Sequence, residues 1–139
     1  MSIIKRSSTT SVVCLAIMLF GGLAWAKTYH FTGTRVDPSA MGDMGLTHDK
    51  NGNNLVNVRV EHLAKPAMLT PPSTMYVVWF QQPGSDPENE GQLQVDNGLK
   101  GELRTTTPLH NFDVFITAET DPTVKTPSDA VVLHGTIQE

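Results

Sequence analysis

The sequence predicts an all-β protein, an antiparallel β-sandwich of the immunoglobulin-like kind with seven to eight short strands. Three observations support this prediction. Short runs rich in valine, threonine and aromatic residues recur along the chain, and glycine, proline or asparagine turns separate them. One run alternates strictly between apolar and polar residues, as a half-buried strand does. Beyond residue 26 there is neither a helical period of useful length nor an internal repeat.

Residues 1–26 have the pattern of a secretory signal peptide that precedes the domain. Lys5 and Arg6 come before an uncharged apolar run, and Ala24-Trp25-Ala26 supplies the small residues of a cleavage site. The apolar run is shorter than the roughly 20 residues that span a bilayer. We therefore expect export to the periplasm or the extracellular space, cleavage after Ala26 and no membrane attachment afterwards. Retention of the segment as an N-terminal anchor is the alternative.

Residues 27–139 are expected to form a single domain, a β-sandwich with one core. The only cysteine is Cys14, so this part of the chain can form neither a disulfide nor a thiolate metal site. The formal charge of −4 becomes about −6 when Lys5 and Arg6 leave with the signal peptide. This acidic balance argues against nucleic acid and against anionic lipid as partners.

The first strands are predicted from β-favouring runs and the turns between them. Residues 27–36 form the first such run, and Asp37-Pro38-Ser39 ends it. Residues 40–47 are predicted to be a short strand that pairs with the next one. The Asn51-Gly52 dipeptide between the two is typical of a tight hairpin.

Residues 55–62 give the clearest strand pattern in the chain. One face carries Val56, Val58 and Val60, while Asn57, Arg59 and Glu61 occupy the other. Residues 64–72 contain three prolines and are therefore predicted to be a crossing loop.

The densest apolar and aromatic run beyond the signal segment is Met75–Phe80, which predicts a central strand. An acidic surface loop is expected at residues 82–91. The remaining elements are, in chain order, a hairpin of residues 92–95 and 101–105 around Asp96-Asn97-Gly98, a strand at 111–117, a proline-broken loop at 121–128 and a strand at 130–137.

Three of these strands, at 75–80, 112–116 and 130–133, carry apolar residues on both faces. A sandwich strand normally has one wet face, so a sheet of these three would expose an apolar patch that needs cover. The cover could be the 64–72 loop or the N-terminal strand. Cover by a partner or by a second copy of the chain is the alternative.

The candidate interaction face follows from this pattern and comprises Tyr76, Val78, Trp79, Phe80 and Phe115. A tryptophan on a central sandwich strand is commonly a core anchor, but an exposed one stacks on sugars or fills a partner's pocket. Tyr76 and Trp79 lie an odd number of positions apart, so they point to opposite faces.

The sequence predicts no catalytic residue, no cofactor and no metal site. Asp49, Asn51 and Asn53 are spaced like the start of an EF-hand loop, but the glycine and the bidentate glutamate of that loop are missing. Met41, Met44 and His48 raise the alternative of a copper site. No nucleophile elbow or His-Glu-x-x-His pair occurs, and Asp86, Glu88 and Glu90 are expected to be solvated loop charges.

Four short stretches together resemble a known family. They are Tyr76–Trp79, Glu90-Gly91, Phe115–Glu119 and Thr126-Pro127-Ser128, and the combination is similar to the extracytoplasmic domain of anti-sigma-K factors and to related small exported proteins. The likeness covers roughly Leu55 to Ile137. It implies a β-sandwich outside the cytoplasm and no catalytic residue.

The chain also departs from that family. It lacks the sigma-binding segment and the transmembrane helix that precede this domain in anti-sigma-K factors, so sigma-factor binding is not implied. The glycine-rich turn usual before the Pro-Ser step is replaced by residues 121–125.

Together these features predict an exported, non-catalytic module for protein interaction or structure, whose partner is an unknown protein or a second copy. A periplasmic carrier of a small ligand or of copper is the alternative. An enzyme of unknown class is the third reading.

Overall fold

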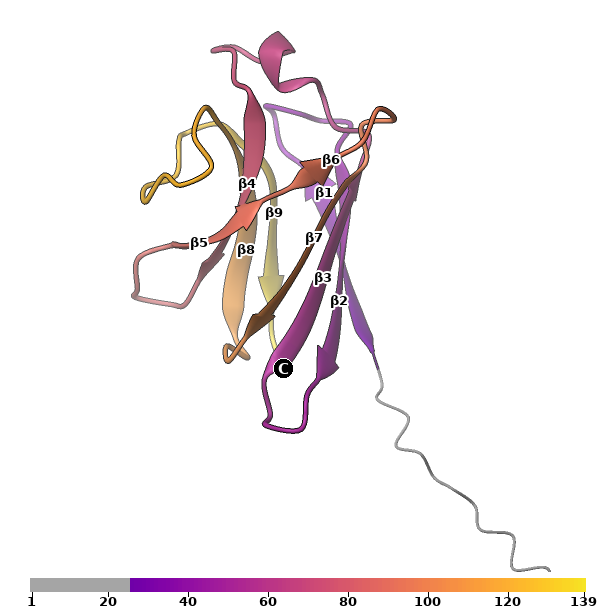
Figure 1. Ribbon diagram of the computed structural model, residues 1–139, viewed down its shortest axis with the longest axis vertical. Helices are drawn as coiled ribbons and strands as arrows, with labels where there is room; N and C mark the ends of the chain where they lie inside the picture. Colours follow the sequence, from indigo (N-terminus) through magenta and orange to yellow (C-terminus); the bar gives the residue numbers. More distant parts are fainter. Residues whose placement is uncertain (1–25) are drawn as a thin grey trace, which may run out of the picture.

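The computed structural model describes residues 26–139, which form nine strands and one short 3₁₀ turn (Figure 1). The predicted signal peptide lies outside the described residues, except for Ala26. The strands are β1 (Lys27–Gly33), β2 (Met41–His48), β3 (Asn54–Glu61), β4 (Met75–Gln81), β5 (Glu88–Gln92), β6 (Gln94–Val95), β7 (Gly101–Thr107), β8 (Phe112–Glu119) and β9 (Val131–Ile137), with η1 at Pro66–Met68.

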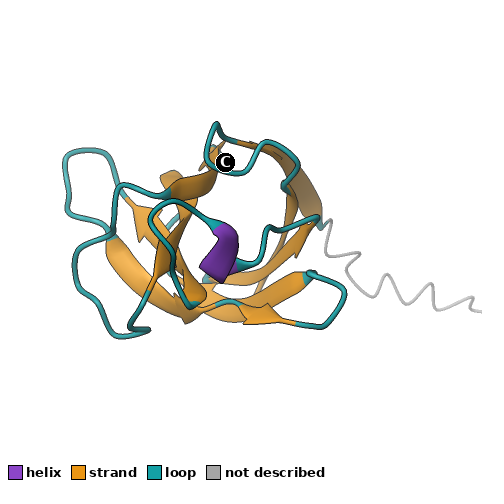
Figure 2. Cartoon of the chain, turned by 90° about the horizontal axis from the view of Figure 1, so that it is seen from above, coloured by secondary structure: helices purple, strands orange, loops and turns teal. Residues whose placement is uncertain are grey.

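All nine strands belong to one antiparallel sheet with the order β5-β4-β8-β9-β1-β2-β3-β7-β6. The sheet curls into a nearly closed ring, and the view from above shows strands on all sides of a common centre (Figure 2). The all-β class is therefore confirmed, while the immunoglobulin-like sandwich stays a prediction. Among residues 26–139 no helix has the length and hydropathy needed to span a bilayer.

The end strands of the sheet are consecutive in the chain, and this brings its two ends together. Leu93, the single residue between β5 and β6, donates its N–H to the Tyr76 carbonyl of β4 at 2.9 Å. Directly afterwards, β6 pairs with β7 through Gln94 and Val95. The segment therefore leaves one end of the sheet and joins the other within three residues.

The core lies inside the curl and consists of the inward residues of nearly every strand. The alternation predicted for residues 55–62 is confirmed, since Val56, Val58 and Val60 are buried. On β2 the inward positions hold Met44 and Leu46.

The 64–72 loop covers one end of the curl, where η1 appears over the strands in Figure 2. Leu69 is buried there, whereas Met68 is 78% exposed. The Tyr76 hydroxyl donates to the Ala64 carbonyl at 2.6 Å, and the Ala64 N–H donates to the Asp37 carboxylate at 2.7 Å. Burial, with a smaller effect from the Asp37 charge, raises the pKa of Tyr76 to about 12, so the hydroxyl stays a donor at neutral pH.

Two expectations about strands differ from the structure. Met75–Phe80 is a strand, but β4 lies second from the end of the sheet and not at its centre. Residues 88–92, expected in a surface loop, form β5, because the free edge of β4 offers backbone partners that outweigh their weak β propensity.

Candidate functional site

All five residues of the predicted interaction face are buried. Tyr76, Val78 and Phe80 are 0% exposed and point inward, where they belong to the main core. Trp79 and Phe115 point to the outer side of the sheet and are nevertheless buried. The structure therefore places none of the five on a surface that a partner can reach.

The outer side of β4 and β8 is covered by the segment that follows β8. Val77, Trp79 and Phe115 form a second apolar cluster against which Val124 and Val131 pack. The Trp79 and Phe115 rings are nearly parallel, with centroids 6.3 Å apart. The three two-faced strands do adjoin one another, as β4, β8 and β9. The cover is the loop at residues 120–130, and not the 64–72 loop or the N-terminal strand that the sequence led us to expect.

Polar contacts hold this covering loop in place. The Trp79 indole N–H donates to the Thr117 hydroxyl at 2.8 Å, and that hydroxyl donates to the buried Glu119 carboxylate at 2.7 Å. The same carboxylate accepts the Ser128 N–H at 2.7 Å. From β5, the Asn89 amide donates to the carbonyls of residues 122 and 124 at 2.9 and 2.8 Å. The loop is thus hydrogen-bonded directly to β8 and β5, and Trp79 of β4 is linked to it through Thr117 and Glu119.

Glu90 differs from the solvated loop charge predicted for it. It is the extra residue of a β-bulge, since Val78 pairs with Gly91 and Trp79 with Asn89. Burial, and to a lesser extent the charge of Glu88, raises the pKa of Glu90 to about 7. Gly91, whose φ of +124° suits glycine, is the one sequence signal that could have indicated the bulge.

We expect Glu90→Gln to stabilise the protein by about 1–2 kcal/mol at pH 8, after allowance for solvent screening of a half-exposed group. Because the folded pKa lies above the usual value of 4.5, the folded state binds the proton more tightly and stability falls as pH rises from about 4.5 to 7. Urea unfolding at pH 4 and pH 8 measures this, and the gain should vanish at pH 4. Asp86→Asn, in the preceding turn, is the control. An equal gain at both pH values would contradict the assignment.

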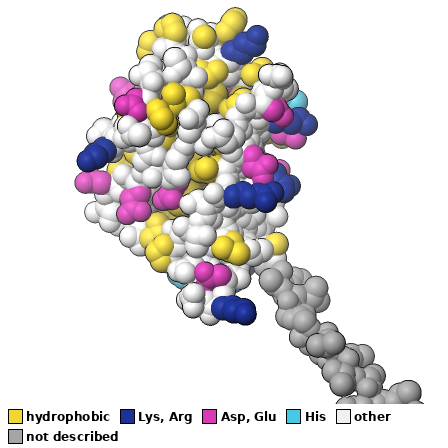
Figure 3. All heavy atoms as spheres, in the orientation of Figure 1, with side chains coloured by type: hydrophobic (Ala, Val, Ile, Leu, Met, Phe, Trp, Pro, Cys, Tyr) yellow, Lys and Arg dark blue, Asp and Glu magenta, His cyan; other side chains and the backbone are white. Residues whose placement is uncertain are grey.

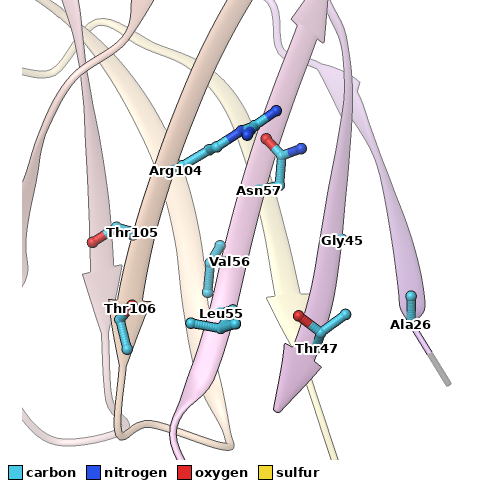
Figure 4. A pocket seen from close by; sticks show the side chains of 9 residues that line it. All are labelled: Ala26, Gly45, Thr47, Leu55, Val56, Asn57, Arg104, Thr105 and Thr106. Carbon is cyan, nitrogen blue, oxygen red and sulfur yellow. The ribbon is translucent and has the colours of Figure 1, made fainter. Parts of the chain in front are cut away.

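Among residues 26–139 no loop covers the outer side of β2, β3 and β7, in contrast to the covered half, and this side is called the bare face. A hollow of about 550 Å³ lies on it (Figure 4). Gly45 has no side chain, and a Cβ built there would meet nothing closer than the Asn57 carbonyl oxygen at 4.0 Å. The hollow is lined by Ala26, Gly45, Thr47, Leu55, Val56, Asn57, Arg104, Thr105 and Thr106.

The side chains around this hollow combine several kinds of contact. Figure 4 shows Arg104 and Asn57 near each other at one end, with Leu55 and Thr106 at the other. Arg104 pairs with Glu102 on the same strand at 2.9 Å. With its amide nitrogen toward Glu102, Asn57 accepts hydrogen bonds from Arg59 at 3.0 and 3.1 Å. Leu55 adds a side chain that is 43% exposed. No sequence pattern singled out this surface, because its residues are the polar face of an ordinary alternating strand.

The residues considered for metals are not brought together. The Asp49 carboxylate caps the hairpin, because it accepts hydrogen bonds from the backbone N–H groups of Asn51 and Asn53 at 2.8 and 2.9 Å. A hydrogen bond from the Asn53 side chain, together with these backbone bonds, lowers the pKa of Asp49. Met41 lies outward and Met44 inward on β2. Within residues 26–139 no three His, Cys, Asp or Glu side chains are placed to share a metal ion.

One further polar cluster lies where β2, the β7–β8 turn and the end of β9 meet. His110 and His48 both approach the Glu139 carboxylate, at 2.5 and 3.5 Å, and the buried Asn54 amide donates to it at 2.9 Å. Hydrogen bonds from Asn54 and His110, with the charges of His110 and His48, lower the pKa of Glu139 against the opposing effect of its desolvation. These contacts fasten the last residues to the neighbouring strands.

The chain therefore presents one covered and one bare half of a single sheet, and the bare half carries the hollow with mixed polar, charged and apolar lining. Such a surface can bind by complementarity. Comparison with family models, with curated proteins and with solved structures finds no match to this chain.

Proposed function

We propose that the chain is an exported, non-catalytic protein-interaction module that binds its partner through the bare outer face of β2, β3 and β7. The observation that carries the proposal is the unequal covering of the sheet. The chain covers the outer side of β4 and β8 with its own loop and leaves the hollowed face open.

The composition of the bare face supports a protein partner. An arginine and an exposed leucine border the hollow, and both signs of charge occur nearby at Arg59, Glu102 and Arg104. Arginine is enriched at protein interfaces, and complementary charges fix the orientation of a partner. A second copy of the chain is one such partner.

A photo-crosslinking residue at position 106 tests the proposal in the cell that exports the protein. We expect crosslinked species at this position and a loss of at least fivefold when Arg104→Glu is added, because the reversal removes the cation beside the hollow. The Arg104 side chain is 75% exposed, so the melting temperature should not change.

The control places the same crosslinker at position 120, which is exposed at the start of the covering loop. Sedimentation of the purified residues 27–139 separates self-association from a foreign partner. Equal crosslinking at both positions, or none at position 106 with a monomer in solution, would contradict the proposal.

The hollow also supports the second candidate function, a carrier of a small ligand. Its volume lies in the range of small-molecule sites, although it is open and not enclosed. This function predicts a rise in melting temperature with sugars, copper or calcium, and Gly45→Leu should abolish the rise by filling the floor. No shift across that panel would count against it.

Export after cleavage at Ala26 and the likeness to the anti-sigma-K extracytoplasmic domain belong to the same proposal. The likeness rests on the four sequence stretches alone. Two of these stretches lie in contact, because the Ser128 N–H and hydroxyl donate to the Glu119 carboxylate and the Ala118 carbonyl. The immunoglobulin-like sandwich is likewise proposed, supported by the two facing halves of the curled sheet. Amino-terminal sequencing of the exported protein tests the cleavage site.

A further inference from the structure

The curled sheet has an opening between β5 and β7. Along its whole length β7 pairs with β3, but it pairs with β6 only at Gly101 and Glu102. Within residues 26–139, the far edge of residues 103–107 therefore pairs with no strand, although Leu103 contacts β5 at Gly91. Among the described strands, β5 pairs with β4 alone. In Figure 1, the arrow end of β7 lies below β5 and β6.

The hydrogen-bond alternation shows which backbone groups face the opening. Asp96 N–H donates to the Lys100 carbonyl at 2.9 Å, and this bond fixes the phase of the β6–β7 hairpin. In an antiparallel pair every second residue turns its N–H and C=O toward the same neighbour. Those of Glu102, Arg104 and Thr106 thus point to the open side, and only Glu102 has a strand residue opposite it there.

The opening has an apolar residue, Leu103, on its β7 side and two acidic residues, Glu88 and Glu90, on its β5 side, which is called the acidic rim below. Leu103 packs partly exposed against the core, and its Cδ1 lies 3.7 Å from a Cβ built on Gly91 of β5. Glu88 and Glu90 lie on the β5 side, and neither forms an ion pair with any described residue. Figure 3 shows hydrophobic side chains on this face between acidic side chains on one flank and a mixed cluster on the other.

We propose that the opening accepts an extended, cationic segment of a partner protein, which adds a strand to the free edge of β7 and places a lysine or arginine beside Glu88 and Glu90. Backbone bonds to Arg104 and Thr106 supply the register. An apolar side chain of the segment covers Leu103, and its cation compensates the half-buried charge of Glu90. The inference rests on the proposed role in protein interaction and assigns the kind of partner.

The acidic rim also accounts for selectivity at this edge. A free strand edge invites pairing with any extended chain, and bulges and charges placed along it discourage such pairing. The bulge at Glu90 and the two carboxylates do this on β5. A cationic segment is favoured by the same charges that repel acidic ones, so the edge discriminates by sign.

A labelled ten-residue peptide of alternating lysine and valine tests the inference by fluorescence anisotropy and amide hydrogen exchange. We expect saturable binding and slower exchange of the amides of Arg104 and Thr106. Glu88→Lys together with Glu90→Lys should weaken binding at least tenfold, whereas Asp129→Lys, on the covering loop, should change it less than twofold.

Two peptide controls separate strand addition from attraction by charge alone. The glutamate-valine peptide should not bind, and alternate N-methylation of the lysine-valine peptide should abolish binding by removing its donors. Retained binding after N-methylation, unchanged exchange of β7, or no binding at millimolar peptide overturns the inference. The two proposals fail separately. If only the hollow binds a partner, Arg104→Glu lowers crosslinking at position 106 whether or not the peptide binds.

Discussion

Replacing Trp79 with alanine is expected to lower the free energy of unfolding by about 3–5 kcal/mol. The side chain is 0% exposed, stacks on Phe115 and donates its indole N–H to Thr117. Alanine removes the largest side chain of the outer cluster. It also removes the indole N–H that donates the first hydrogen bond in the series from Trp79 through Thr117 to Glu119. Urea unfolding measures the loss, and a dye that binds exposed apolar surface should report the uncovered cluster before global unfolding.

The companion variant Trp79→Phe separates packing from hydrogen bonding. It keeps an aromatic ring against Phe115 and loses the indole N–H, so we expect a loss of about 1–2 kcal/mol and no dye binding. If Trp79→Ala cost less than Trp79→Phe, or neither changed stability, the covering loop would not depend on this side chain.

Local patterns predicted most of the strands correctly because they depend on neighbouring residues alone. Residues 55–62 alternate, and β3 buries the valines that this alternation places inward. The Asn-Gly and Asp-Asn-Gly turns are where the chain reverses. The expected lack of helix agrees with the single short turn at η1.

The arrangement of the strands depends on contacts that local patterns do not contain. Met75–Phe80 is apolar on both faces, which predicted a central strand. β4 is indeed covered on both faces, but it is the second strand from the end of the sheet, next to β5. The loop that covers it, residues 120–130, is largely hydrophilic, and only its Val124 packs on the outer cluster. Asn89 fastens this loop from β5, a strand that weak β propensity concealed.

The candidate surfaces were missed for a related reason. The sequence directs attention to apolar clusters, and those of this chain are covered by the chain itself. The hollow arises where Gly45 leaves a gap in a polar face, and the opening beside β7 arises because β6 is only two residues long. The first depends on a missing side chain and the second on a missing stretch of paired strand, and residue composition reveals neither.

Gly135→Ala is expected to destabilise the protein by about 2–3 kcal/mol, because it forces a side chain into a closely packed core. A Cβ built on Gly135 of β9 would lie 1.8 Å from Cδ1 and 2.0 Å from Cε1 of Phe31. The Phe31 ring is buried against that backbone and forms part of the contact between β1 and β9 at their short pairing. Thermal unfolding should show the loss, and Phe31→Leu in the same chain should restore part of it by removing the clashing ring.

Gly45→Ala is the matched control, because it makes the same change on the bare outer face. A Cβ there meets no atom closer than 4.0 Å, and alanine loses less backbone entropy on folding than glycine does. We therefore expect no loss or a gain of about 0.5 kcal/mol. A similar loss at both glycines would mean that both strands resist any side chain, and the Phe31 contact would then not be the cause. A loss confined to Gly135 would identify the Phe31 ring at the β1–β9 junction as its cause, because the same added methyl group costs nothing where no side chain lies opposite it.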